Sequence, residues 1–220
     1  MSEAPGLTKS AKPTLLYYML LISAWIAAWL FSIQIGLGGE SAGVGVIYWT
    51  SAKILLWLMP ILVIIKLCLQ RSILEYLAMR QLFVGAKTGI VCGLIFAAVS
   101  FLGDVSTKRF SLPSIDPGLL NALLIAPVFE ETLFRGFILR ALQESAISFW
   151  IANLITACMF LGIHVPGRYF MDSPRVFQVS AILGIILVGL CAGISKHISG
   201  SIYGSIAFHL VNNMYSLLPR

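Results

Sequence analysis

The chain has 220 residues, of which 59% are hydrophobic and only 11% are charged. Soluble domains average about 45–50% apolar and about 25% charged residues. Together with a mean hydropathy of +0.93, this composition excludes an ordinary soluble enzyme, a disordered chain and a basic nucleic-acid-binding protein. The formal net charge of +6 is better interpreted as the loop charge that orients a membrane protein. We predict an integral membrane protein that lies in the lipid bilayer and has no nucleic-acid partner.

Seven apolar stretches are each long enough for a helix that crosses a bilayer, which takes about 20 residues. They cover residues 15–35, 46–67, 85–103, 118–142, 148–165, 176–195 and 200–218. Their hydrophobicity is continuous rather than alternating, which favours helices over the strands of a membrane barrel. The sequence therefore predicts an all-α fold, a polytopic membrane helix bundle of about seven transmembrane helices.

Two shorter features predict how these helices are arranged. Residues 71–84 mix three charged residues with Leu, Tyr and Phe, a pattern typical of an amphipathic helix that lies in the membrane interface. Gly85, Gly89 and Gly93 recur every four residues, a spacing that lets two helix backbones approach closely in lipid. We interpret this glycine ladder as a packing feature and not as part of a site.

Lysine and arginine in the loops predict the orientation, because cytoplasmic loops carry an excess of basic residues. If the N-terminus is cytoplasmic, that side holds Lys9, Lys12, Lys66, Arg71, Arg80, Lys87, Arg140 and Lys196. The opposite side then holds Lys108, Arg109, Arg168, Arg175 and Arg220. The first loop, residues 36–45, contains no basic residue. We therefore predict that the N-terminus is cytoplasmic.

The fourth apolar stretch contains ionisable residues, which are costly inside a membrane and usually mark function. Arg135 follows Glu131 by four residues and shares its helix face, so we expect these two side chains to form an ion pair. Glu130 points about 100° away and is left free to handle protons. Pro127 has no amide hydrogen, and we expect the helix to bend or restart there, with both glutamates in its first turn. The alternative is an ion-pair network without chemistry.

Two histidines lie in separate apolar stretches. His164 lies near the end of the fifth, where Pro166 is expected to end the helix. His209 lies within the seventh, and Asn213 follows four residues later on the same helix face, whereas we expect Asn212 to point away. A single intramembrane histidine is often a packing residue. Two of them on different helices, together with a glutamate pair on a third, favour a functional site.

Three motifs, each on an apolar stretch, carry a resemblance to a known family. They are Glu130-Glu131-x-x-x-Arg135, Phe160-x-x-x-His164 and His209-x-x-x-Asn213, in that order along the chain. Together they resemble the CAAX protease and bacteriocin-processing (Abi-type, CPBP) family of intramembrane endopeptidases, which is related to the Ras-converting CAAX endopeptidase. The resemblance covers roughly residues 115–218. We therefore predict N-terminal transmembrane helices and the interfacial segment at 1–114 and a catalytic transmembrane core at 115–220.

The resemblance implies a role for each motif residue. Glu130 looks like the general base that activates the attacking water, and His164 looks like the residue that shares or orients this water. His209 and Asn213 look like the donors that stabilise the tetrahedral oxyanion. The residues that support this site are Glu131, Arg135 and Phe160. The implied activity is that of a glutamic-type intramembrane protease, a CAAX-endopeptidase-like hydrolase.

A zinc metalloprotease is the less favoured mechanism. Glu130, His164 and His209 have the donor types for three zinc ligands, with water in the fourth position. The His-Glu-x-x-His motif of zinc proteases is absent from the sequence, however. Asn213 also suits an oxyanion site better than a zinc site. We therefore expect no cofactor and no metal.

The family implies a membrane-associated protein or peptide as substrate. Its members remove the last three residues of prenylated proteins, process peptide leaders or act on C-terminal sorting signals. A chain of this size without large loops favours a prokaryotic cell (inner) membrane. The predicted orientation puts His164 nearer the non-cytoplasmic face, so we expect the cavity to open outward and to serve an exported substrate.

Two other functional classes stay open at this point. A non-catalytic membrane scaffold or immunity-type protein predicts that Glu130→Ala leaves the phenotype intact. A proton-coupled transporter also uses Glu, His and Arg within its spans, and Pro127 is compatible with a broken helix at a binding site. Such a transporter usually contains an internal repeat, and we find none in the sequence.

Overall fold

The computed structural model describes residues 11–37, 43–104, 117–171 and 178–217, and every regular element in these ranges is helical. The uninterrupted helices are α1 (Ala11–Gln34), α4 (Ile73–Tyr76), α5 (Leu82–Asp104), α9 (Phe149–Phe170), α10 (Val179–Ser199) and α11 (Ile202–Leu217). The predicted all-α fold is therefore confirmed.

Two further helices run through turns of π-helix, in which five residues instead of four separate donor and acceptor. The first consists of α2 (Val44–Lys53), η1 (Ile54–Leu58), α3 (Met59–Val63) and η2 (Ile64–Cys68). The second consists of α6 (Pro117–Leu120), η3 (Asn121–Ile125), α7 (Ala126–Glu131), η4 (Thr132–Ile138) and α8 (Leu139–Glu144).

Five helices of the described ranges are long and apolar enough to cross a membrane. They cover Lys12–Gln34, Val44–Cys68, Leu82–Leu102, Phe149–Phe170 and Val179–Ser199 and correspond to the first, second, third, fifth and sixth predicted spans. The fourth predicted span is the charged run from α6 to α8, and the seventh is α11, which has 16 residues. Both are helical, and the number of seven crossings stays a prediction.

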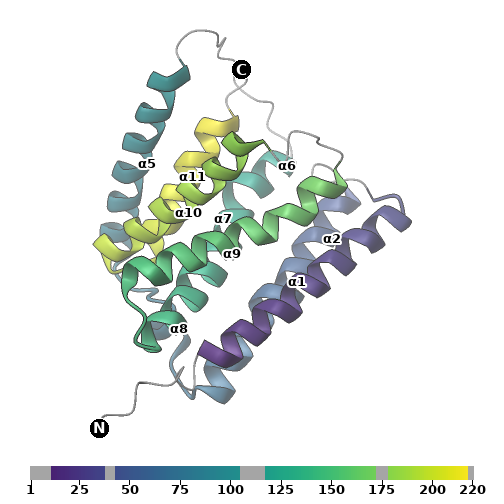
Figure 1. Ribbon diagram of the computed structural model, residues 1–220, viewed down its shortest axis with the longest axis horizontal. Coiled ribbons are helices and arrows are strands. Elements are labelled where there is room, and N and C mark those ends of the chain that lie inside the picture. The colour runs from purple at the N-terminus through teal and green to yellow at the C-terminus, as the bar shows by residue number, and fades with distance from the viewer. Residues whose placement is uncertain (1–10, 38–42, 105–116, 172–177, 218–220) are drawn as a thin grey trace.

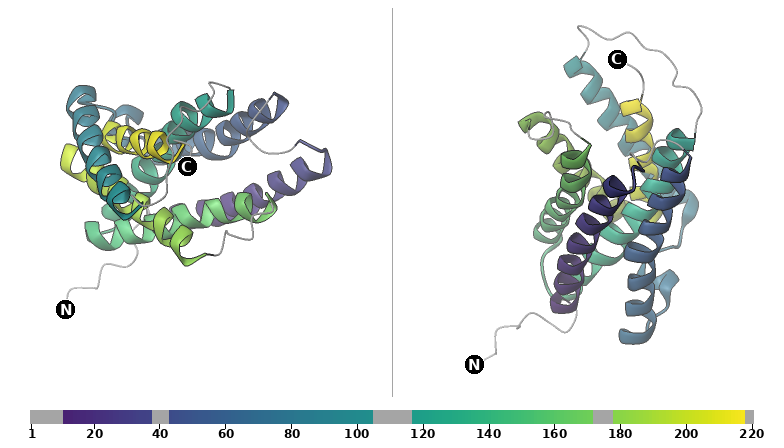
Figure 2. Two further views of the ribbon diagram at one scale, coloured as in Figure 1. Left: turned by 90° about the horizontal axis from the view of Figure 1, so that it is seen from above. Right: turned by 90° about the vertical axis from the view of Figure 1, so that its right-hand side faces the viewer.

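The helices form two rows, which are visible from above in Figure 2. One row contains α1, α9 and α10, and the other contains α2, the run from α6 to α8, and α11, with α5 beside α11 (Figures 1 and 2). The run from α6 to α8 thus lies next to both α9 and α11. This arrangement brings together the three segments that carry the predicted motifs.

The apolar core lies between the two rows and is richest in aromatic side chains where α1 meets α2. Trp25, Trp29, Trp49 and Trp57 are all buried there. Neighbouring rings in this cluster have centroids 4.1 to 5.1 Å apart. Tilted and edge-to-face contacts at such separations are favourable for aromatic pairs, so the cluster fixes α1 against α2.

Contacts just before α4, α5 and α11 and at the end of α8 tie one end of the bundle together. An ion pair of 3.3 Å joins Arg71 to Glu144 at the end of α8. The hydroxyl of Ser201, just before α11, donates to the carbonyl oxygen of Arg80 at 2.6 Å.

The glycine ladder of α5 packs against α11. A Cβ atom on Gly89 would lie 2.2 Å from the carbonyl oxygen of Gly204 and 2.7 Å from the Cβ of Ala207. Real Cβ atoms do not approach other atoms so closely, so the two backbones meet only because residue 89 is glycine. The ladder thereby sets the position of α11, which carries His209.

Two expectations about local structure are wrong. Residues 71–84 do not form one amphipathic helix, because α4 ends at Tyr76 and Ala78 and Gln81 adopt positive φ angles of 54° and 59°. Pro166 does not end the fifth helix, because α9 continues to Phe170. Proline is tolerated within membrane helices when surrounding groups compensate for the lost backbone hydrogen bond.

Candidate active site

The centre of the candidate site is a buried ionic network around Glu131. Arg135 Nη1 donates to Glu131 Oε1 at 3.1 Å, and both side chains are completely buried. Arg135 Nη2 donates to the backbone carbonyl of Gly189 on α10 at 2.6 Å. The Nδ1–H of His209 on α11 donates to the same Glu131 oxygen at 2.8 Å. The network therefore joins three helices, and the sequence predicted only its Glu131–Arg135 contact.

The helix that carries the two glutamates does not restart at Pro127, because η3 leads directly into α7; the expected placement of both glutamates in a first helical turn is therefore wrong. The π turn of η3 comes immediately before α7, whose first turn contains Pro127. This turn changes the hydrogen-bond register at the point where proline supplies no amide hydrogen. Glu130 and Glu131 end α7 and lead directly into η4, so they do not lie at a free helix N-terminus.

Glu130 faces the two predicted histidines. Its Oε2 atom lies 3.7 Å from Nε2 of His209 and 4.0 Å from Nε2 of His164. Both separations exceed a direct hydrogen bond and match the kind of polar contact that a water molecule bridges. Glu130 is 8% exposed. Adjacent glutamates thus point in different directions, one into the ionic network and one toward the histidines.

The ring of His164 is fixed by its own helix. Its Nδ1 lies 2.7 Å from the carbonyl oxygen of Phe160, and because a carbonyl only accepts, Nδ1 must donate. In the neutral ring, Nε2 is then an acceptor that faces Glu130. The Phe160 ring contacts both Arg135 and His164. The Arg135 guanidinium lies 4.7 Å from the centroid of the Phe160 ring, and the centroids of the Phe160 and His164 rings are 4.5 Å apart.

Two asparagines of α11 complete the polar residues. Asn213 Nδ2 donates to the carbonyl oxygen of Ala122 in η3 at 2.8 Å, and Asn212 Nδ2 donates to Asn213 Oδ1 at 3.3 Å. Asn212 was expected to point away from the site, but both asparagines line the same cavity as His209. Positions three and four residues along a helix both flank the first residue's face, which explains the difference.

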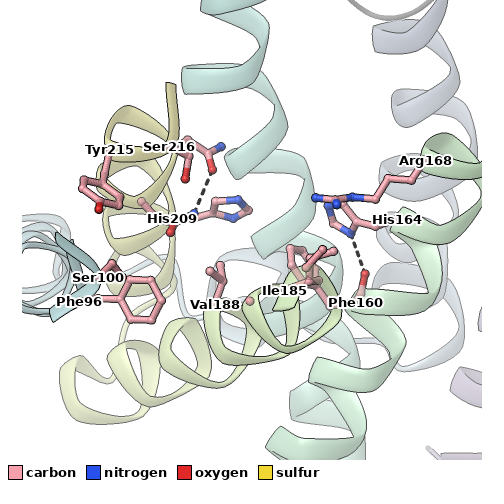
Figure 3. A pocket seen from close by; sticks show the side chains of 14 residues that line it. Phe96, Ser100, Phe160, His164, Arg168, Ile185, Val188, His209, Tyr215 and Ser216 are labelled. Atoms are coloured by element: carbon pink, nitrogen blue, oxygen red, sulfur yellow. Dashed lines mark hydrogen bonds between the residues drawn. The ribbon is translucent and has the colours of Figure 1, made fainter. Parts of the chain in front are cut away.

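A cavity of about 470 Å³ lies beside these residues, between α5, α9, α10 and α11. Figure 3 shows His164 and Arg168 extending from one helix toward His209 on the other side of this cavity. Its lining residues are Phe96, Ser100, Phe160, His164, Arg168, Ala181, Gly184, Ile185, Val188, His209, Asn212, Asn213, Tyr215 and Ser216. The lining includes the last turns of α9 and α11, so the cavity extends toward the end of the bundle opposite the Arg71–Glu144 ion pair.

Glu130, His164 and His209 have the donor types of a zinc site. Within the described ranges, no group of three or more His, Cys, Asp or Glu side chains is arranged to hold a metal ion. Glu130, His164 and His209 are therefore not found as a preformed three-ligand group among these residues, and the absence of a metal stays a prediction. Both Nδ1 atoms already have partners, and only the two Nε2 atoms face the carboxylate.

Sequence reasoning missed two cationic neighbours of the site. Lys196 was assigned to a loop but lies in α10, and its Nζ donates to the carbonyl oxygen of Arg135 at 2.6 Å. The backbone carbonyl of Gly189, about two turns earlier in α10, accepts a hydrogen bond from the Arg135 side chain. Arg168 was counted only as a loop charge, yet it lines the cavity one turn after His164. Because His164 and Arg168 are four residues apart, the sequence could have predicted that they share a helix face.

Comparisons with known proteins found one matching family model and one similar protein. Residues 113–215 match the family model "Type II CAAX prenyl endopeptidase Rce1-like". An Escherichia coli protein described as an "Uncharacterized 24.3 kDa protein" is 23% identical over 218 residues, which covers 92% of this chain and 94% of that protein. No solved structure matches the chain. The matched segment contains all three motifs, so the resemblance expected from them is confirmed: residues 113–215 are similar to the Rce1-like CAAX endopeptidases, a family that implies a CAAX-type intramembrane protease.

Proposed function

We propose that the chain is a glutamic-type intramembrane endopeptidase in which Glu130 activates the water that attacks a substrate peptide bond. One observation carries this proposal: the Glu130 carboxylate lies 3.7 and 4.0 Å from the Nε2 atoms of two histidines on different helices. Both rings are held through Nδ1 by other acceptors. Their Nε2 atoms are thereby directed toward the place where a base and its water are needed.

The chemistry follows from the donors and acceptors available. A water between Glu130 and His164 donates one hydrogen to the carboxylate and one to the neutral Nε2 of His164. Its oxygen attacks the carbonyl carbon as Glu130 takes the proton, and a tetrahedral oxyanion forms. Glu130 then returns this proton to the leaving amine as the C–N bond breaks. The products are a new carboxyl end and a new amino end.

The oxyanion is stabilised from α11. Because His209 Nδ1 donates to Glu131, its Nε2 can donate as well only if the ring is an imidazolium. That charge balances the centre, where Glu130 and Glu131 are negative and Arg135 is positive. Asn213 uses one amide hydrogen on Ala122, and its second hydrogen remains for the oxyanion. One such donor accounts for roughly 2.7–4 kcal/mol of transition-state stabilisation.

The proposed reaction needs neither metal nor cofactor. It acts on a membrane-associated protein or peptide, cut close to where the substrate meets the membrane, such as a C-terminal sorting signal of an exported protein. The bundle lies in a prokaryotic cell membrane with its N-terminus in the cytoplasm. The cavity then opens toward the non-cytoplasmic side, because its lining reaches the last turns of α9 and α11.

The test compares protein termini in host-cell membranes that carry the wild type, Glu130→Gln or Glu75→Gln. Glu75 is an exposed glutamate that pairs with Arg80, so its variant is the matched control. We expect new protein ends with the wild type and the control and none with Glu130→Gln at equal abundance. Identical termini in all three strains would contradict the protease and favour the non-catalytic scaffold.

The orientation has its own test. Arg71→Cys and Tyr169→Cys place thiols at opposite ends of the bundle, on exposed positions outside the cavity lining. The background variant replaces the four native cysteines. In intact cells, a membrane-impermeant maleimide should label position 169 and spare position 71. The reverse pattern would place the cavity on the cytoplasmic side.

A further inference from the structure

Asn212 is a buried polar side chain that the proposed chemistry does not use. It precedes Asn213 in α11, is 8% exposed and lines the cavity together with His209. A buried amide costs free energy unless it is hydrogen-bonded. The amide nitrogen Nδ2 of Asn212 donates to Oδ1 of Asn213 at 3.3 Å. The partner of this buried amide is therefore the side chain that the proposed reaction uses as an oxyanion donor.

The contact helps to fix which end of the Asn213 amide faces which neighbour. At the nitrogen end, Nδ2 of Asn213 donates to the carbonyl oxygen of Ala122 at 2.8 Å. At the oxygen end, Oδ1 of Asn213 accepts from Asn212. Exchanging the two ends would set Oδ1 against the Ala122 oxygen and Nδ2 against the Asn212 nitrogen. Since a carbonyl only accepts and an amide nitrogen only donates, both neighbours oppose this exchange.

The direction of the Asn213 amide decides whether it helps or hinders the reaction. An N–H group directed at the oxyanion stabilises it, whereas an amide oxygen in the same place would repel the developing charge. The two bonds also run in one direction, from Asn212 to Asn213 and on to Ala122. Hydrogen bonds in such a chain polarise one another. The Asn212 bond therefore makes the nitrogen end of Asn213 a stronger donor.

We infer that Asn212 is a positioning residue that holds the Asn213 amide in the orientation that stabilises the oxyanion. This inference rests on the proposed protease function and deepens it. Asn213 lies near the end of α11, which ends at Leu217, and helix ends open more easily than helix centres. A second contact to the Asn213 side chain restricts its rotation there. Because Asn212 acts through Asn213, its loss should slow the chemical step without weakening substrate binding.

The cleavage test is a double-variant cycle on the full chain in phosphatidylcholine nanodiscs. The probe is a pool of short peptides with an S-farnesylated cysteine and mixed apolar residues after it. Asn212→Leu keeps most of the side-chain volume and removes the donor. It should lower kcat about fivefold, the effect of one lost hydrogen bond, and leave KM unchanged. In an Asn213→Ala background, the same substitution should change kcat by less than about twofold.

Two further variants complete this cycle. Asn212→Gln keeps an amide donor and should recover part of the lost kcat. Met214→Leu changes an exposed side chain of the same helix and should alter neither kcat nor KM. Three results would overturn the inference: an unchanged kcat in Asn212→Leu, equal losses in both backgrounds, which would mean that Asn212 contacts the substrate directly, or a fall in the melting temperature that accounts for the lost activity.

A binding measurement separates this inference from the proposed function. The probe is the same peptide pool with a phosphinate in place of one peptide bond, which mimics the tetrahedral oxyanion. Asn212→Leu should weaken its binding about fivefold when Asn213 is present and leave it unchanged in the Asn213→Ala background. This pattern without cleavage by the wild type would refute only the protease. Cleavage without this pattern would refute only the role of Asn212, and the absence of both would refute both.

Discussion

Replacing Arg135 by alanine tests the buried network most directly. The substitution removes the hydrogen bonds to Glu131 and to the Gly189 carbonyl oxygen and leaves the Glu131 carboxylate completely buried beside His209. Breaking a buried ion pair by removing one partner costs about 3–5 kcal/mol. Because both side chains are 0% exposed, solvent does not screen this interaction.

The matched control is Arg80→Ala, which breaks an ion pair with Glu75 whose side chains are 70% and 58% exposed. Exposed pairs contribute about 0–1 kcal/mol. With the scaling of soluble proteins of similar size, we expect Arg135→Ala to lower the melting temperature on the order of 10 °C, and the control to change it little. The assay is thermal unfolding of the detergent-solubilised protein, followed by size-exclusion fluorescence.

A double variant separates charge from packing. Combining Arg135→Met with Glu131→Gln removes both charges and keeps most of the buried volume, a change that is often neutral or stabilising. We expect it to restore thermal stability but not cleavage, because a neutral amide no longer holds the His209 imidazolium. If Arg135→Ala melts and accumulates like the wild type, the network does not stabilise the fold and the reasoning is wrong.

The other predictions concern single positions. His164→Ala should abolish cleavage and leave the melting temperature within a few degrees, measured with the same two assays. Glu131→Gln should lose both activity and stability, whereas Glu130→Gln should lose activity alone; equal melting temperatures would contradict the separate roles. Gly89→Ala should cost about 1–3 kcal/mol because its Cβ would meet the Gly204 carbonyl, against no measurable loss for Val91→Ala on the lipid-facing side of α5. Removing divalent metals with a chelator should leave cleavage unchanged, and a full loss that only zinc restores would favour the metalloprotease.

The course of the helices was largely predictable from hydropathy, and the errors have a common cause. An apolar run marks where lipid or core contacts a helix, not where its hydrogen bonds stop. The fifth helix was expected to end before Pro166, yet α9 reaches Phe170. Lys196 was placed in a loop for the same reason, although α10 continues to Ser199. Polar residues continue these helices because their side chains find partners at the ends of the bundle, as Lys196 does at Arg135.

The site was predictable as a set of residue types but not as a set of contacts. Helical spacing within one segment was sufficient for the pair Glu131–Arg135. The bond between Glu131 and His209 joins residues that are 78 positions apart, and no periodicity within a helix contains that information. The π turns were also invisible in the sequence pattern, because a local change of hydrogen-bond register leaves the hydrophobicity of the segment unchanged.

The geometry explains why two adjacent glutamates differ so much in what surrounds them. Successive residues on a helix point about 100° apart, so one carboxylate reaches the Arg135–Gly189 side and the other reaches the histidines. The network around Glu131 uses His209 Nδ1, which leaves Nε2 of the same ring directed at Glu130. The His209 ring thus faces both carboxylates, and its position depends on α11, which the glycine ladder of α5 sets. Packing of α5, far from the motifs in sequence, is therefore part of what aligns the proposed catalytic base with its donors.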